Sequence, residues 1–156
     1  MSEREPTVIA RTVTRTVVPI ILVTAIALLL RGHNLPGGGF IAGVLTVTAF
    51  ALVYVIYGSD VVERDLVRVA PSFEREFPGA ADVYGATFAA GLAVAAGSGL
   101  TAILLGHPFL TQGVVFVEHL PLYGELEVAS AFAFDVGVYL VVVGALLTII
   151  SVVGAE

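Results

Sequence analysis

The chain alternates between long apolar stretches and shorter polar ones. Four stretches are long and apolar enough to form helices that cross a membrane, and they are assigned to residues 10–31, 40–57, 83–105 and 128–153. Within the first two, Val17 to Leu30 and Phe40 to Tyr57 contain no charged residue. A helix needs about 20 predominantly apolar residues to cross the hydrocarbon layer. The pattern therefore predicts an all-α, polytopic membrane protein with four transmembrane helices in a single domain over residues 1–156.

The sharpest polar break lies between the first two apolar stretches. It is a motif of turn-forming and polar residues, namely Arg31, Gly32, His33, Asn34, Pro36, Gly37, Gly38 and Gly39, followed by Phe40. Proline disfavours the helical conformation at the residue before it, and glycine allows a sharp turn and the close approach of another backbone. We call residues 31–40 the corner. It is predicted to be a tight, closely packed turn between two membrane helices.

Two further polar segments separate the remaining apolar stretches. Residues 59–81 form the one long polar segment and contain several charged residues, and apolar residues recur among them at helical spacing. This predicts a short amphipathic segment lying at the membrane surface. Residues 106–126 contain a short apolar centre, Val114 to Val117, that is compatible with either a strand or an interfacial segment.

Small residues are concentrated in the third apolar stretch. Gly91, Ala95 and Gly99 recur every four residues, which places them on one face of a helix. In lipid, small residues let helix backbones approach closely. The predicted packing residues are these three together with Gly137 and Gly144 of the last stretch, and so many small residues favour a helix that touches protein on several sides.

Composition narrows the class of function. The chain is 58% hydrophobic and only 13% charged, contains no cysteine, and has a formal net charge of −6. The missing cysteine excludes a disulfide framework and a thiolate metal site, and the acidic balance argues against binding nucleic acid. There is no phosphate-binding glycine loop and no recognisable catalytic constellation. An autonomous enzyme is therefore not expected, nor is a cofactor or a metal site.

The arginines indicate an orientation. Six of the seven basic residues lie on the side shared by the N-terminus and the 59–81 segment, and only Arg31 lies on the other. Positively charged residues are enriched in cytoplasmic loops. Both termini are therefore predicted to be cytoplasmic, with the corner on the outer side of the cell membrane.

Three residues are candidates for an ion path: Asp135, His33 and Glu118. Asp135 is placed about two turns into the last predicted helix, where a carboxylate is costly unless it has a partner and is often functional. It could take up protons or bind Na+, or it could be a structural acid bonded to a neighbouring helix. His33 could relay protons, although local hydrogen bonding is the stronger interpretation. Glu118 beside His119 is a weak metal signal, because no third ligand follows.

The corner closely resembles the signature of the B subunit of Mrp-type, or Mnh-type, multisubunit Na+/H+ antiporters. A second stretch, residues 134–144, resembles the same family and includes Asp135, Gly137 and Gly144. The resemblance implies one MnhB-like domain in a complex with large proton-pumping subunits related to respiratory complex I, with other small membrane subunits, and with Na+ and H+ as the transported ions. It leaves open a purely structural scaffold in a related assembly, such as an ion-pumping membrane-bound hydrogenase.

Overall fold

Four long helices account for most of the structure, a computed structural model. It describes residues 7–31, 37–58, 80–108, 114–120, 124–129 and 131–154. The helices are α1 (Val8–Arg31), α2 (Gly39–Tyr57), α4 (Ala80–Leu104) and α5 (Ala131–Gly154). All four are long and apolar enough to cross a membrane. The predicted all-α membrane fold with four spanning helices is thereby confirmed.

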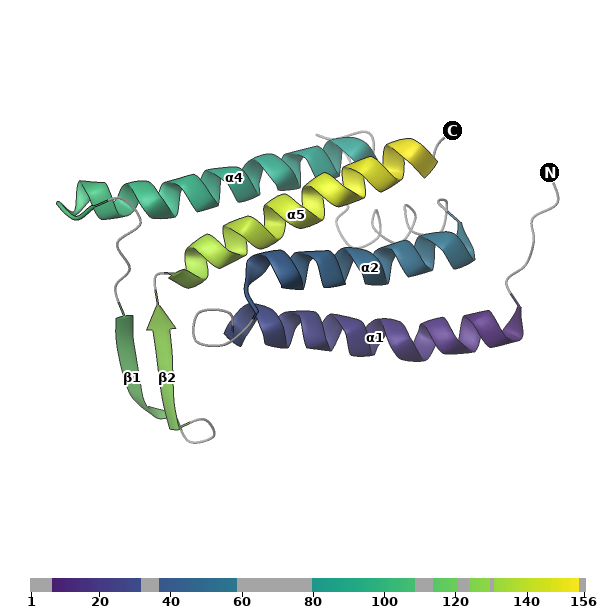
Figure 1. Cartoon of the computed structure of the whole chain (residues 1–156), viewed down its shortest axis with the longest axis horizontal. Helices are drawn as coiled ribbons and strands as arrows, with labels where there is room; N and C mark the ends of the chain where they lie inside the picture. Colours follow the sequence, from purple (N-terminus) through teal and green to yellow (C-terminus); the bar gives the residue numbers. More distant parts are fainter. Residues whose placement is uncertain are drawn as a thin grey trace.

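The helices lie side by side in the order α1, α2, α5, α4 (Figure 1). The last helix therefore lies between the second and the third. The start of α1 and the end of α5 lie at the same end of the helix axes (Figure 1). Both α2 and α5 begin at the opposite end of these axes. This arrangement brings the start of α2, which includes the last residues of the corner, next to the start of α5.

A short hairpin connects α4 to α5. Strands β1 (Val114–Leu120) and β2 (Gly124–Ala129) are antiparallel, with Val117 opposite Leu126 and an irregularity between Glu118 and Leu120. The apolar centre of this loop is thus a strand, one of the two predicted alternatives. The hairpin projects from the row at the end where α5 begins (Figure 1).

The hairpin also shifts the start of the last helix. Residues 128 and 129 are helical in the sequence-based assignment, but they pair in β2 with residues 115 and 114, and α5 begins at Ala131. These apolar residues could either pair with a neighbouring strand or form the first turn of the helix. The backbone hydrogen bonds to β1 favour the strand.

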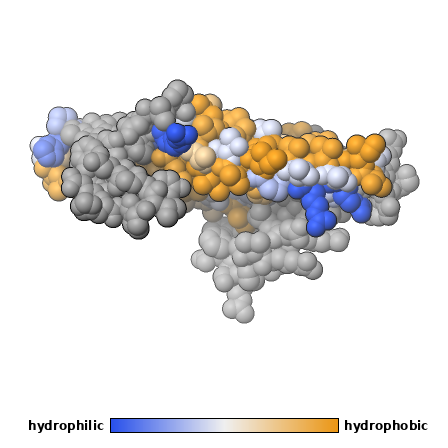
Figure 2. All heavy atoms as spheres, turned by 90° about the horizontal axis from the view of Figure 1, so that it is seen from below, coloured by the Kyte–Doolittle hydropathy of each residue, from blue (hydrophilic) through white to orange (hydrophobic). Residues whose placement is uncertain are grey.

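The row has a small interior of its own. A buried cluster joins Val47 of α2, Tyr84 of α4 and Leu147 of α5. In the most apolar part of each helix, the buried share of residues ranges from only 11% in α1 to 33% in α2. Figure 2 shows apolar side chains along much of the face that α1 presents. Most of the apolar surface therefore needs lipid or other protein subunits to cover it.

The amphipathic segment predicted at residues 59–81 lies largely outside the described residues, which resume at residue 80 with the start of α4. That segment stays a prediction.

Candidate functional site

The carboxylate of Asp135 lies at the N-terminus of α2. The first residues of a helix present backbone N–H groups that have no partner within the helix, and they carry the positive end of the helix dipole. Gly38 precedes α2 and has no side chain to cap it. Asp135 of α5 supplies this function instead, because its Oδ1 accepts a long hydrogen bond of 3.5 Å from the Gly39 backbone N–H. An acid from one helix thus caps another.

This contact requires glycine on the α2 side. A Cβ on Gly39 would overlap the backbone carbonyl oxygen of Asp135 and would lie 2.9 Å from the backbone nitrogen of Tyr139. One turn further along α2, a Cβ on Gly43 would lie 2.9 Å from the Cβ of Val142. The α2 and α5 backbones therefore approach one another more closely than any side chain at position 39 would allow.

Gly38 connects this site to α1. Its backbone N–H donates to the Leu28 carbonyl oxygen at 3.2 Å, which satisfies one of the last carbonyl groups of α1. Its φ of 99° lies in a region that L side chains rarely adopt, and a Cβ there would lie 3.4 Å from the Asp135 Oδ1. The last two glycines of the corner thus bring α1, α2 and α5 together.

A second polar contact lies deeper between α2 and α5. The Thr46 hydroxyl and the Tyr139 phenol are 3.1 Å apart, and either can be the donor. Other threonine hydroxyls in the helices bond to the carbonyl four residues earlier, as Thr48 does with Val44 at 2.8 Å. Thr46 is buried, whereas Thr48 is exposed. The buried hydroxyl therefore makes a contact between helices, and sequence analysis missed this pair.

Small residues line the contact between α4 and α5. A Cβ on Gly91 would lie 2.6 Å from the backbone nitrogen of Val141, and one on Gly137 would lie 2.6 Å from that of Ala95. A Cβ on Gly144 would overlap the backbone nitrogen of Phe88. Gly99, the remaining predicted packing residue, is buried in α4. Four of the five predicted packing residues thus lie at close backbone approaches in this contact.

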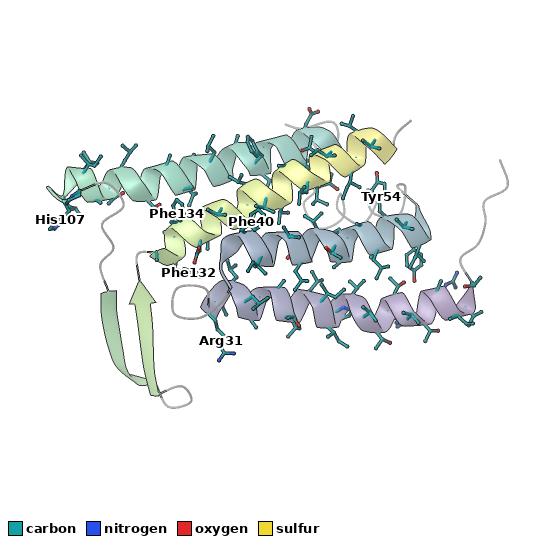
Figure 3. The ribbon with its side chains drawn as sticks, viewed as in Figure 1. Arg31, Phe40, Tyr54, His107, Phe132 and Phe134 are labelled. Atoms are coloured by element: carbon teal, nitrogen blue, oxygen red, sulfur yellow. The ribbon has the colours of Figure 1, made fainter. Side chains whose placement is uncertain are left out.

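Asp135 lies nearer to the helix end than predicted. It is the fifth residue of α5, just past the first turn, because α5 begins later than expected. The side chain is half-buried. The labelled rings of Phe40, Phe132 and Phe134 gather around the starts of α2 and α5 (Figure 3). The carboxylate therefore lies close to the N-terminal end of α5.

The remaining predicted residues of the corner and of the ion path lie elsewhere in the structure or outside the described residues. Arg31 ends α1 with an exposed side chain that points away from the row of helices (Figure 3). His33 lies outside the described residues, as do Gly32, Asn34 and Pro36. Glu118 lies in β1 of the projecting hairpin, and its side chain is also outside the described set. Within the described ranges, no group of three or more His, Asp or Glu residues is placed to hold a metal ion.

Comparisons with known proteins give consistent results. Residues 9–148 match a family model described as a domain related to the MnhB subunit of Na+/H+ antiporter. The chain is 38% identical over 149 residues to the B subunit of a Na+/H+ antiporter from Alkalihalophilus pseudofirmus, covering 96% of this chain and 93% of the relative. It is 39% identical over 148 residues to the B subunit of a Na+/H+ antiporter from Bacillus subtilis, covering 95% and 93%.

Two longer proteins also match. A probable A/B subunit of a K+/H+ antiporter from Rhizobium meliloti is 36% identical over 132 residues, which cover 85% of this chain and 12% of that protein. Among solved structures, a chain of the Mrp complex from Dietzia sp. DQ12-45-1b matches with a TM-score of 0.71 and 28% identity, over 94% of this chain and 14% of that one. This chain therefore corresponds to a small part of each of these two proteins.

Proposed function

Because the chain belongs to the family of domains related to the MnhB subunit of Na+/H+ antiporters, we propose that it is a small integral-membrane subunit of a multisubunit cation/proton antiporter. In this role it is a multi-pass protein of the cell membrane that takes part in transport and is not an enzyme. Its partners are the other subunits of the antiporter complex, surrounding lipid, and the transported Na+ and H+.

The observation that carries this proposal is the contact between the two motifs that resemble the family. They lie about a hundred residues apart in the sequence, and they meet where the Gly39 N–H faces the Asp135 carboxylate. We expect a site built from two such distant segments to be the part of the subunit that acts in transport. An ionisable side chain within a membrane-spanning helix supports a role for Asp135 in the cation or proton path.

The small buried interior supports membership of a larger complex. Four helices that leave most of their apolar surface uncovered have room for protein neighbours on both sides of the row. In relatives, the transported cation is named as Na+ in two cases and K+ in another. We propose Na+ for this chain, since the two relatives named for Na+ are aligned over nearly their whole length.

A second candidate function is that of a scaffold, in which Asp135 is purely structural. The hydrogen bond to Gly39 favours it, because a carboxylate at a helix N-terminus is stabilised without any transported ion. The same fold would serve an antiporter or a related ion-pumping membrane complex. The role of Asp135 is the point on which the two candidates differ.

The orientation proposed for the chain places both termini in the cytoplasm. It is supported by the six arginines on the side of the N-terminus and the 59–81 segment. It is also supported by the start of α1 and the end of α5, which lie at the same end of the helix axes (Figure 1). The corner and the Asp135 carboxylate are then at the outer surface.

Replacing Asp135 with Asn separates the two candidates. Asparagine keeps the shape and an oxygen that can accept from the Gly39 N–H, but it cannot ionise. We expect the complex to assemble at normal levels while Na+-dependent proton exchange in everted membrane vesicles falls by about a hundredfold, the scale of a lost proton-transfer group. Normal exchange in Asp135→Asn would leave only the scaffold function.

A matched control uses the same substitution in α4. Asp82 lies in the first turn of α4 and is exposed, and no hydrogen bond to another helix is recorded for it among the described residues. Asp82→Asn removes one negative charge without touching the contact between α2 and α5. We expect both assembly and exchange to be normal. A loss of exchange in both variants would point to a general effect of charge and not to a path through Asp135.

A further inference from the structure

Two arginines near the start of α1 form an exposed pair. Arg11 and Arg15 are four residues apart, so their side chains lie on the same side of the helix, and both are exposed. Within the described ranges, no acidic side chain forms an ion pair with either. The pair is therefore available to a negatively charged ligand from outside the described part of the chain.

The position of the pair is electrostatically unfavourable without such a ligand. Like charges four residues apart on a helix repel one another. The N-terminus of a helix carries the positive end of its dipole, which disfavours Arg11 at the end of the first turn of α1, and that turn holds no acidic residue. The Thr7 hydroxyl, which accepts from the Ala10 N–H at 3.2 Å, is the cap at this end and carries no charge. A bound anion would remove both conflicts.

The depth of the pair indicates where that anion lies. Arg31 is the last residue of α1, sixteen residues after Arg15 and twenty after Arg11. At about 1.5 Å per residue these separations are roughly 24 and 30 Å, against a hydrocarbon layer of roughly 30 Å. With Arg31 at one boundary, Arg11 lies at the other and Arg15 lies about one turn inside it. Both guanidinium groups can then reach the phosphate layer by extending along the helix.

The neighbouring side chains are apolar and exposed. Val13 and Ile20 lie on the bilayer side of Arg11 and are 50% and 60% exposed. A free phosphate ion would leave these side chains in water, whereas a phospholipid brings a phosphate group and acyl chains together. From these observations we propose that Arg11 and Arg15 bind the phosphate of an anionic phospholipid in the leaflet at the start of α1.

The chain offers a direct way to measure this, because it contains no tryptophan. A single tryptophan at Thr16 lies beside the pair, is exposed, and is slightly deeper than Arg15. A single tryptophan at Ile26, which is 57% exposed, lies at a matched depth from the Arg31 end of the same helix. The full-length chain carrying either one is placed in phosphatidylcholine vesicles. Quenching by brominated phosphatidylglycerol or brominated phosphatidylcholine then reports which lipid is beside each position.

We expect Thr16→Trp, but not Ile26→Trp, to report a preference for phosphatidylglycerol over phosphatidylcholine. Arg11→Gln and Arg15→Gln should each lower that preference about fivefold, and the double variant should abolish it. Quenching by brominated phosphatidylcholine should be unchanged in these variants, which shows that the helix keeps its depth. Equal preferences at both positions would overturn the proposal.

Two further arms identify the source of the anion. Inorganic phosphate should leave the preference for phosphatidylglycerol unchanged. A loss of that preference when inorganic phosphate is added would assign the pair to free phosphate instead. Glu3→Gln with Glu5→Gln tests the acidic residues that precede α1 in the sequence. A preference that appears only in this double variant would show that the chain's own carboxylates occupy the pair, which would contradict lipid binding. None of these measurements depends on antiport.

Discussion

At the scale of single residues, the glycines of this chain have very different surroundings. Gly39 begins α2 with its Cα pressed against the α5 backbone, whereas a Cβ on Gly97, in the middle of α4, would have no atom within 4 Å. Both residues lie in helices, so the intrinsic preference of alanine over glycine applies to both. What differs is the space that a methyl group would enter.

We therefore expect opposite results from the same substitution. Gly39→Ala should destabilise the assembled complex by more than about 3 kcal/mol, because α2 and α5 must separate to admit the methyl group. Gly97→Ala should be neutral or stabilising by up to about 1 kcal/mol. The thermal stability of the complex in mild detergent and its amount in membranes measure both. Equal stability for the two variants would show that the close approach at Gly39 does not matter.

The sequence predicts these residues singly but not their partners. Glycine in a turn and an acid in an apolar stretch are visible in the residue pattern, and Gly38, Gly39 and Asp135 are identified that way. The pairing of Asp135 with the Gly39 N–H depends on which helices are neighbours, and no local pattern carries that information. For the same reason the sequence does not show that the Thr46 hydroxyl faces Tyr139 of another helix.

At the scale of elements, α5 has two different contact faces. Its contact with α2 combines glycines with two hydrogen bonds. The Asp135 carboxylate accepts one from the Gly39 N–H, and the Tyr139 phenol shares the other with the Thr46 hydroxyl. The contact of α5 with α4 depends on close backbone packing at Gly91, Gly137 and Gly144. Helices in lipid gain little from the hydrophobic effect between them, so both kinds of contact contribute to holding α5 in place.

A double-mutant cycle measures the deeper hydrogen bond. Tyr139→Phe and Thr46→Val each remove one hydroxyl, and we expect a coupling energy of about 0.6 kcal/mol, typical of hydrogen bonds between membrane helices. The measurement is the thermal or detergent-induced unfolding of the complex containing each single variant and the double variant. Additive effects would mean that the two hydroxyls do not interact.

Thr48 supplies the control for that cycle. It lies two residues after Thr46 on α2, and its hydroxyl bonds to Val44 within its own helix. A cycle between Thr48→Val and Tyr139→Phe should therefore give no coupling. Any coupling there as large as that for Thr46 would indicate a change in the packing of α2 and not a hydrogen bond.

The elements themselves are largely predictable, but their order in space is not. Long uncharged stretches identify membrane helices because charged groups are costly in lipid, and this locates all four helices to within a few residues. The predicted start of α5 is wrong because the apolar residues 128 and 129 suit a strand as well as a helix. The placement of α5 between α2 and α4 follows from the fit of particular glycines, which composition does not reveal.

At the scale of the whole molecule, the row of helices has little interior. Val47, Tyr84 and Leu147 form its buried cluster, and every helix exposes large apolar side chains, α5 only near its C-terminal end. A soluble protein of this size would bury a much larger core. These side chains must therefore be covered by lipid or by neighbouring subunits.

We expect the chain to be degraded faster when it is produced without the other subunits of its complex. Solubilised in mild detergent from cells that contain the complex, it should migrate in a particle far larger than its own 16.2 kDa. Pulse-chase half-lives with and without the partner subunits measure the first effect, and native gel migration measures the second. A stable, monomeric chain in both conditions would contradict membership of a complex.

The side-by-side order of the helices also fixes the width of the protein from α1 to α4. With neighbouring axes about 8–10 Å apart, the axes of α1 and α4 at the two margins are separated by roughly 24–30 Å. Subunits that bind at α1 and at α4 are therefore held apart by about this distance. Because α5 is joined to α2 by hydrogen bonds and to α4 by close backbone contact, a tilt imposed at one margin would be carried across the width to the other.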